Sequence, residues 1–414
     1  MAMQMAAAHA VNRKLVDPIF EAGQACQAAI KEFGIDKVTN ATIGTLLDDA
    51  GNLVVLPTVE KVFREMQMAE FTAYAPISGR ADYLDYVYRQ VFGGTHFEGY
   101  FSSVATSGGT GAVHHAIANY AERGDRVLTS DWHWGTYGVI CSETGKKLDT
   151  FRLFDADYKN FNVNAFSDKV EEILEGQSSL LIILNTPAHN PTGYALTDDE
   201  WEKVLNVIRI NAAQGNKITL LIDVAYIDFA GDRENAWGFM KNFANLPENV
   251  LLLIAYSMSK SYTFYGQRTG ALAAFSTNQE VIAEFEQTCK YSSRATWSNI
   301  NHGAQVLFTK INKNKALRAE LAADQKVFRE LVSQRAEIFI NEAAECGLQI
   351  VPYRGGFFIA VPTENAGAVC KKLHEDLIFA VPLKLGIRVA ACSTPAQKMS
   401  GVAEKMKKAI DAIE

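Results

Sequence analysis

The stretch Val250–Lys260, VLLLIAYSMSK, passes from a continuous apolar run into a short polar segment that ends in a lysine. An apolar run of this length is typical of a strand that is buried on both faces of a parallel sheet. Leu180–Leu184 and Thr219–Ile222 are runs of the same kind earlier in the chain. We therefore expect all of these segments to be strands of one buried sheet.

Predicted helices alternate with these strands. Trp201–Ala213 has helical spacing and follows Thr197-x-x-Glu200, a capping box that satisfies the free amides at a helix start. Gly111–Glu122 predicts another helix, and Arg126–Thr129 a short strand. Alternating strands and helices favour an α/β fold with a mainly parallel sheet flanked by helices.

The pattern changes after about residue 312. A long charged amphipathic helix, from about Ala316 to Ala344, is followed by short apolar runs that suggest a smaller α+β domain. These runs are 348–351, 357–361, 378–381 and 387–391. We predict a large domain over residues 57–312 and a small C-terminal domain over 313–414, which the N-terminal segment 1–56 joins.

The composition limits what the chain binds. Its 414 residues are 48% hydrophobic, enough for a large core, and its net charge of −7 argues against a broad nucleic-acid surface. None of the six cysteines forms a C-x-x-C pair, and no spacing of metal ligands is present. No apolar stretch reaches membrane-spanning length. These features predict a cytoplasmic protein with reduced thiols, no metal, no nucleic acid and no membrane.

Polar residues follow two of the predicted strands. Asp223 and Tyr226 come after one, and Lys260 after another, so the carboxyl edge of the sheet brings them to one site. Each residue also has an ordinary alternative role. Asp223 could cap a turn, Tyr226 could be a core aromatic residue, and Lys260 could be a surface lysine. Together they suit pyridoxal phosphate, because a lysine amine condenses with its aldehyde, a carboxylate pairs with its ring nitrogen and a tyrosine donates to its ring oxygen.

A phosphate needs its own donors. The Gly-rich turn at 106–111, TSGGTG, opens a predicted helix whose free amides attract an anion. It lacks the Gly-Lys-Ser/Thr ending of a nucleotide P-loop. Ser257, Ser259 and Arg268 would complete the phosphate site.

Four motifs occur in order along the chain. They are Asn190-Pro-Thr-Gly, Asp223-x-x-Tyr, Ser257-x-Ser-Lys, and Arg268 eight residues after Lys260. Their order and spacing resemble those of the class I, fold-type I aminotransferases that use pyridoxal phosphate, within the aspartate and aromatic subgroup. The resemblance spans about residues 40–393, most of the chain.

The resemblance implies that Lys260 forms the Schiff base with the cofactor and carries the proton, with Asp223 and Tyr226 completing the catalytic set. The residues that it implies at the cofactor are Gly109, Thr110, Trp134, Asn190, Asp223, Tyr226, Ser257, Ser259, Lys260, Arg268 and, from a neighbouring subunit, Tyr74. Trp134 matches the ring that stacks on the pyridine, although Trp132 competes for this role. Tyr137 stands where aspartate enzymes have a histidine that supports the aspartate.

The substrate residues that the resemblance implies are Gly44, Asn190, Arg294 and Arg388. Arg388 would hold the α-carboxylate, because a planar guanidinium suits a two-point contact. Arg294 would reach a distal carboxylate across a homodimer interface. Its segment departs from the subgroup pattern by losing a proline pair and one residue, so a surface arginine remains the alternative.

The implied reaction is a ping-pong transfer of an amino group from an L-amino acid, aspartate or an aromatic one, to a 2-oxo acid, with 2-oxoglutarate as the expected acceptor. The same cofactor site also serves a β-lyase acting on an amino acid. A regulatory domain that only senses the cofactor is the non-enzymatic alternative.

Overall fold

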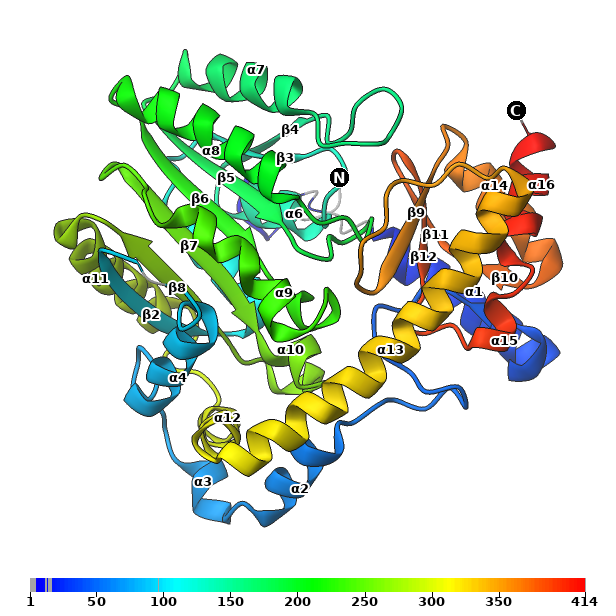
Figure 1. Ribbon diagram of the computed structural model, residues 1–414, viewed down its shortest axis with the longest axis horizontal. Coiled ribbons are helices and arrows are strands. Elements are labelled where there is room, and N and C mark those ends of the chain that lie inside the picture. The colour runs from blue at the N-terminus through cyan, green and yellow to red at the C-terminus, as the bar shows by residue number, and fades with distance from the viewer. Residues whose placement is uncertain (1–4, 12, 14–16, 96, 414) are drawn as a thin grey trace.

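The computed structural model describes residues 5–11, 13, 17–95 and 97–413. Within them, the largest sheet has seven strands (Figure 1). They are β2 (Tyr100–Thr106), β3 (Arg126–Ser130), β4 (Lys147–Phe151), β5 (Ser179–Asn185), β6 (Lys217–Asp223), β7 (Val250–Ser257) and β8 (Gly270–Ser276). Their order is β2-β8-β7-β6-β5-β3-β4, and β8 alone of them runs antiparallel to its neighbours. The predicted mainly parallel sheet is confirmed.

Helices cover both faces of this sheet because successive residues of a strand point to opposite sides. The helices between residues 57 and 313 are α2 (Pro57–Glu65), α3 (Met68–Thr72), α4 (Ala81–Val91), α5 (Gly108–Asn119), α6 (Thr136–Glu143), α7 (Val163–Leu174), α8 (Asp198–Ala213), α9 (Arg233–Trp237), α10 (Met258–Ser261), α11 (Gln279–Thr296) and α12 (His302–Lys313). On β5, Leu181 and Ile183 join the core beneath α5, α6 and α11, while Leu180 and Ile182 join the core beneath α7 and α8.

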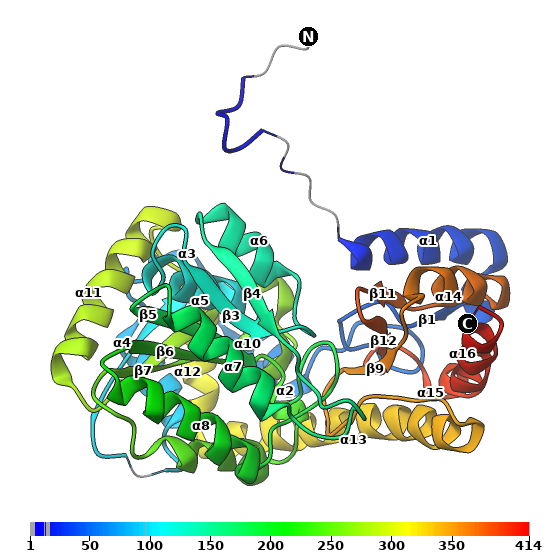
Figure 2. The ribbon, with the colours of Figure 1, turned by 90° about the horizontal axis from the view of Figure 1, so that it is seen from above.

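A second, smaller group of elements lies beside the large sheet (Figure 2). Its strands are β1 (Thr39–Asn40), β9 (Phe358–Pro362), β10 (Ile378–Phe379), β11 (Val381–Leu383) and β12 (Gly386–Ala390). Its helices are α1 (Pro18–Phe33), α14 (Ala366–Leu373), α15 (Ala396–Met399) and α16 (Val402–Asp411). The strands β11-β12-β9 form an antiparallel sheet, and β1 pairs with β10. The helix α13 (Lys315–Cys346) runs from the large sheet to this group.

The expected elements differ from the observed ones in a few places. The helix expected from Gly111 begins three residues earlier, at Gly108. Gly108, Gly109 and Gly111 all lie at its start, where close neighbours leave little room for a side chain. The strands β2, β4 and β8 are not among the expected segments, and β8, with the sequence GALAAFS, lacks the β-branched residues that mark strands. The run at 348–351 forms no strand. The capping box of α8 is confirmed, with Glu200 and Thr197 bonded reciprocally.

None of the described helices is both long and apolar enough to cross a membrane. In the same part of the chain, no three His, Cys, Asp or Glu side chains are grouped so that they could hold a metal ion.

Candidate active site

The carboxyl ends of three adjacent strands bring the predicted site residues together. Asn185, Asp223 and Ala255 are partners in register on β5, β6 and β7. A cavity of about 220 Å³ opens at this edge. Its lining consists of Gly109, Thr110, Trp134, Asn185, Asn190, Asp223, Ala225, Tyr226, Ser257, Ser259, Lys260, Tyr265 and Arg268. The structure therefore gathers ten of the eleven predicted cofactor residues around one cavity, and Tyr74 lies outside it.

Lys260 lies in α10, which begins where β7 ends. Its Nζ donates a hydrogen bond of 2.6 Å to the carbonyl oxygen of Gly44 and lies 4.6 Å from the ring centre of Tyr265. Burial lowers the pKa of Lys260 to about 8. An amine with this pKa is partly neutral near pH 8, and the neutral form is the nucleophile and the base.

Asp223 ends β6 and is only 5% exposed. Its Oδ2 accepts a hydrogen bond of 2.7 Å from the hydroxyl of Tyr137, and its Oδ1 accepts one of 3.2 Å from the amide of Ala225. Burial raises the pKa of Asp223 to about 6, and the two hydrogen bonds oppose this rise. Tyr137, which stands where the aspartate enzymes have a histidine, thus donates a hydrogen bond to this carboxylate.

A tyrosine and an amide lie next to Asp223. The Nδ2 of Asn190 lies 3.5 Å from the hydroxyl oxygen of Tyr226, at the outer limit of a hydrogen bond. Asn185 orders this corner, because its Oδ1 accepts from the amide of Asn190 at 2.6 Å and its Nδ2 donates to the carbonyl of Asp223 at 2.7 Å. Asn185 is not among the predicted site residues, although it directly follows the predicted strand Leu180–Leu184.

The cationic end of the cavity is built around Arg268. Its Nη1 donates to Ser259 Oγ at 3.1 Å and to the carbonyl of Tyr265 at 2.8 Å. Gly108 has a φ of +64°, which favours glycine, and a Cβ there would lie 2.7 Å from Arg268 Nη2 and displace the guanidinium from the start of α5. Ser257 Oγ accepts from the amide of Ser259 at 3.2 Å. This corner offers hydroxyl, guanidinium and helix-start donors to an anion.

Arg388 comes from the small sheet, where it pairs with Ala360. It is 3% exposed, and its guanidinium carbon lies 4.2 Å from the ring centre of Phe358. Its Nη2 donates to the carbonyl of Thr42 at 2.8 Å, whereas its buried Nε finds no partner in the described part of the chain. A buried donor without a partner is costly unless a ligand satisfies it.

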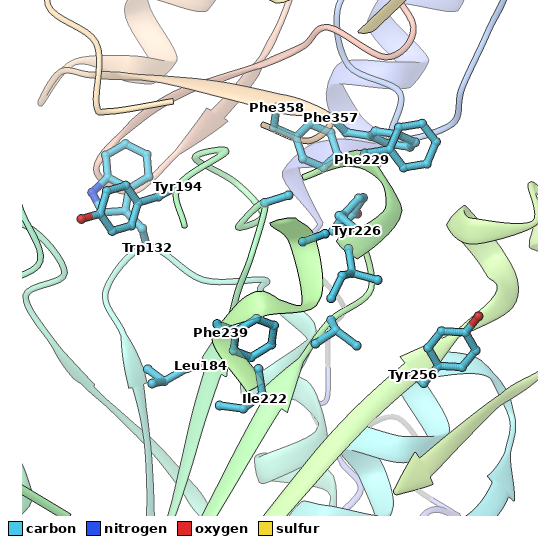
Figure 3. Packing of buried hydrophobic residues seen from close by; sticks show 14 of the residues in the cluster. Trp132, Leu184, Tyr194, Ile222, Tyr226, Phe229, Phe239, Tyr256, Phe357 and Phe358 are labelled. Atoms are coloured by element: carbon cyan, nitrogen blue, oxygen red, sulfur yellow. The ribbon is translucent and has the colours of Figure 1, made fainter. Parts of the chain in front are cut away.

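Aromatic rings close the junction between the large sheet and the small one. Figure 3 shows Tyr226 and Phe229, which follow β6, facing Phe357 and Phe358 at the start of β9. The ring centres of Tyr226 and Phe357 are 5.2 Å apart, and those of Phe229 and Phe357 are 4.6 Å apart. A Cβ on Gly44 would lie 3.1 Å from Phe358, so a large residue there would disturb the ring beneath Arg388.

The two competing tryptophans lie in different places. Trp134 lines the cavity, and its ring meets that of Tyr137 edge-on at 5.5 Å. Trp132 is buried, and a Cβ on Gly386 would lie 2.8 Å from its Cη2, so Trp132 packs against β12. The cavity position favours Trp134 as the stacking ring.

Tyr74 and Arg294 lie outside the cavity. Tyr74 is 89% exposed. Arg294 is exposed in the last turn of α11, where its Nη1 donates to Ser298 Oγ at 2.6 Å. The structure therefore gives neither residue a role within its own subunit, and their roles stay predictions.

Tyr265 also lines the cavity, and it too is not among the predicted site residues. Its hydroxyl accepts a hydrogen bond of 3.0 Å from the amide of Leu46, which ties the segment after Gly44 to the loop after Lys260. The sequence offers one indication of its role, its position five residues beyond Lys260, but a single tyrosine in a loop forms no recognisable motif.

A mainly parallel sheet with a buried lysine at its carboxyl edge, joined to a small sheet that supplies a buried arginine, defines a fold-type I enzyme of the pyridoxal phosphate class. The profile described as "Aminotransferase class I and II" matches residues 36–406, so the chain belongs to this family. The enzyme is an aminotransferase, and a β-lyase is not favoured.

Known proteins support this assignment. A solved aminotransferase from Anaerococcus prevotii DSM 20548 is 36% identical, with a TM-score of 0.96 over 99% of this chain and 100% of that one. The mitochondrial aspartate aminotransferase of Schizosaccharomyces pombe is 28% identical over 74% of this chain and 69% of the relative. An aromatic-amino-acid aminotransferase from Burkholderia pseudomallei, solved covalently bound to pyridoxal phosphate, shares the fold at 21% identity, with a TM-score of 0.81 over 98% of this chain and 100% of that one.

Proposed function

We propose that the aminotransferase takes the amino group of aspartate or an aromatic L-amino acid and passes it to a 2-oxo acid such as 2-oxoglutarate. The observation that carries this proposal is that Lys260 and Arg388 both bond to the segment Thr42–Gly44. A reactive amine and a carboxylate-binding guanidinium are thereby placed at one site. The names of an aspartate and an aromatic relative support the two donor classes.

The polar groups of the cavity fit the ring of pyridoxal phosphate. Asp223 would pair with the ring nitrogen, since a buried carboxylate favours a protonated partner. Asn190 and Tyr226 would contact the ring oxygen, and Trp134 would stack on the ring. The carboxylate thus suits the basic nitrogen of the ring, and the hydrogen-bond donors suit its anionic oxygen.

The cationic corner fits the phosphate. Gly109 and Thr110 lie in the first turn of α5, whose free amides face an anion, and Ser257 and Ser259 add hydroxyls. Arg268 has no carboxylate within 4.0 Å in the described part of the chain, so its charge is available to a ligand. These five residues would hold the phosphate group.

The chain's own residues perform the proton transfer and the positioning. When bound, pyridoxal phosphate supplies an aldehyde that takes up the amino group and a ring that withdraws electrons from the substrate Cα. The neutral Nζ of Lys260 removes the proton from Cα, because its lowered pKa leaves it partly unprotonated. Arg388 orients the substrate through its carboxylate, and the aromatic junction excludes water.

A half-reaction screen tests this function. Single amino acids are added to the enzyme loaded with pyridoxal phosphate, and the conversion of the cofactor to its amino form is followed by absorbance. We expect conversion by aspartate or by an aromatic amino acid, and glutamate formation when 2-oxoglutarate is added. Release of pyruvate and ammonia would indicate a lyase, and bound cofactor without any turnover would indicate a sensor.

Replacing Arg388 by lysine keeps the charge but removes the two-point contact with the carboxylate. We expect the KM of the amino donor to rise by about tenfold to a hundredfold, with a smaller change in kcat. Steady-state kinetics measure both constants, and the exposed Arg123→Lys variant is the control. An unchanged KM in the Arg388 variant would contradict its role.

Replacing Tyr137 by phenylalanine removes the hydroxyl that donates to Asp223. Because this bond favours the ionised carboxylate, its loss raises the pKa of Asp223 above its value of about 6. Cofactor affinity falls at low pH, where Asp223 becomes protonated. The pH at which it falls is expected to rise by about one unit, which corresponds to the free energy of one hydrogen bond. Fluorescence titrations of the apoenzyme with pyridoxal phosphate across pH measure the shift. Superimposable pH profiles would rule out Tyr137 as a positioning residue.

We also propose a homodimer with shared active sites, which would give the exposed Tyr74 and Arg294 a partner. Mixing Lys260→Ala subunits with Arg294→Asp subunits would place one intact site in each mixed dimer. Activity on dicarboxylates that reappears on mixing would support shared sites. A monomer by analytical ultracentrifugation, or no recovery on mixing, would exclude them.

The cytoplasmic location and the division into domains at residues 57 and 313 are also proposals. The six cysteines, which are all free, support a reducing compartment. The packing of α1 against β10 and β11 supports the joining of the N-terminal segment to the small domain.

A further inference from the structure

A second cavity lies away from the candidate active site. Its volume is about 630 Å³, and its lining shares no residue with the cavity at Lys260. The walls are α4, the loop that leads into α9, and the first half of α13, which Figure 1 shows running beside α9 and α10. We call it the basic cavity, after its cations Arg89, Arg233, Lys315, Arg318, Lys326 and Arg329.

Positive charge dominates this lining although the chain as a whole carries −7. The lining contains the two carboxylates Asp228 and Asp232 against six cations. Lys315 and Arg318 lie in the first turn of α13, where the helix dipole adds further positive potential. Neither of them has a carboxylate within 4.0 Å among the described residues. Like charges held together in a concave surface create a strong field for an anion.

Arg89 and Lys326 pair with Asp85 and Glu330, which lie outside the lining, whereas two other cations are held in place by backbone groups. Arg233 Nη2 donates to the carbonyls of Arg89 and Gln90, each at 3.1 Å. Arg329 Nη1 lies 3.4 Å from the carbonyl oxygen of Asp228. A guanidinium that is already oriented loses less conformational freedom when a ligand binds.

Aromatic and apolar side chains also line the basic cavity. Tyr86, Ala319, Leu321 and Ala322 lie among the cations. They offer a surface to the organic part of a ligand, which an inorganic anion lacks.

We propose that the basic cavity binds a small phosphorylated organic anion. The phosphates would lie among Lys315, Arg318 and Arg233, and the organic part would pack against Tyr86 and Leu321. The size of the cavity suits a ligand as large as a nucleotide. This site is independent of the proposed amino donor, because it lies in a separate cavity.

Isothermal titration calorimetry on the enzyme loaded with pyridoxal phosphate tests the site, after excess cofactor has been removed. The probes are ATP without magnesium and inorganic tripolyphosphate. We expect saturable binding of ATP, about tenfold tighter than that of tripolyphosphate, because only ATP has a base and a sugar that pack against the aromatic and apolar lining. Absence of saturable ATP binding, or equal affinities for both probes, would overturn the proposal.

Charge-reversal variants locate the binding. Arg318→Glu is expected to weaken ATP binding by about tenfold, because it replaces an attraction by a repulsion. The matched control is Lys313→Glu, another exposed cation that lies outside the lining. The cofactor absorbance and the thermal midpoint report that both variants are folded. An equal loss of affinity in the two variants would show non-specific attraction and overturn the assignment of the cavity.

Discussion

Replacing Lys260 by alanine is expected to abolish transamination while pyridoxal phosphate remains bound without a covalent link. The substitution removes the amine that carries the proton, and the cationic corner around Arg268 and the carboxylate of Asp223 stay in place. The loss of a positioned general base and of the covalent attachment is expected to lower kcat by about 10⁴-fold or more. Stopped-flow absorbance with a donor amino acid measures the remaining rate.

The matched control is Lys203→Ala, since Lys203 is exposed on α8 and is not one of the residues that line the cavity. Its kinetics should match those of the wild-type enzyme. The purified Lys260→Ala variant should still contain the cofactor. Acid or denaturant should release this cofactor, and borohydride should not link it covalently to the protein. Transamination by Lys260→Ala at the wild-type rate would remove Lys260 from the mechanism.

Replacing Asp223 by asparagine is the second large effect that we expect. The two side chains have the same shape, so the contact with Tyr137 survives while the negative charge is lost. A neutral residue no longer stabilises a protonated ring nitrogen, and removal of one such preorganised charge lowers kcat by about 10²–10³-fold. Steady-state kinetics and the cofactor absorbance spectrum measure the effect.

Asp223→Glu keeps the charge and tests whether charge or shape matters. We expect it to retain more activity than Asp223→Asn, whereas the exposed Asp168→Asn control leaves kinetics unchanged. If the asparagine variant were the more active of the two, the charge of Asp223 would not be what catalysis requires.

The candidate cofactor site was largely predictable from local sequence. Asp223, Tyr226, Ser257 and Lys260 each lie within a few residues of a buried strand end, and the carboxyl ends of parallel strands share one edge. The strands themselves were predictable because continuous apolar runs have few alternatives in a chain of this length. By contrast, β8 carries small residues that match no strand pattern, although it lies inside the sheet, between β2 and β7.

The substrate side of the site depended on contacts between distant residues. Gly44 and Lys260 are 216 residues apart, and Thr42 and Arg388 are 346 apart, yet each pair shares a hydrogen bond. The choice between Trp134 and Trp132 also needed the fold, because both lie in the same short segment and only Trp134 lines the cavity. Local patterns carry no information about which of two neighbouring rings faces a distant strand.

The sequence by itself determined the alternation of strands and helices, the capping box of α8 and the cluster of reactive groups around Lys260, because these depend on hydrogen bonding and burial along short segments. Only the tertiary structure decided that Arg388 and Lys260 both bond to the segment Thr42–Gly44. It also decided that six cations line a separate cavity. Such meetings are set by how whole sheets and helices pack, and packing joins residues regardless of their separation in the chain.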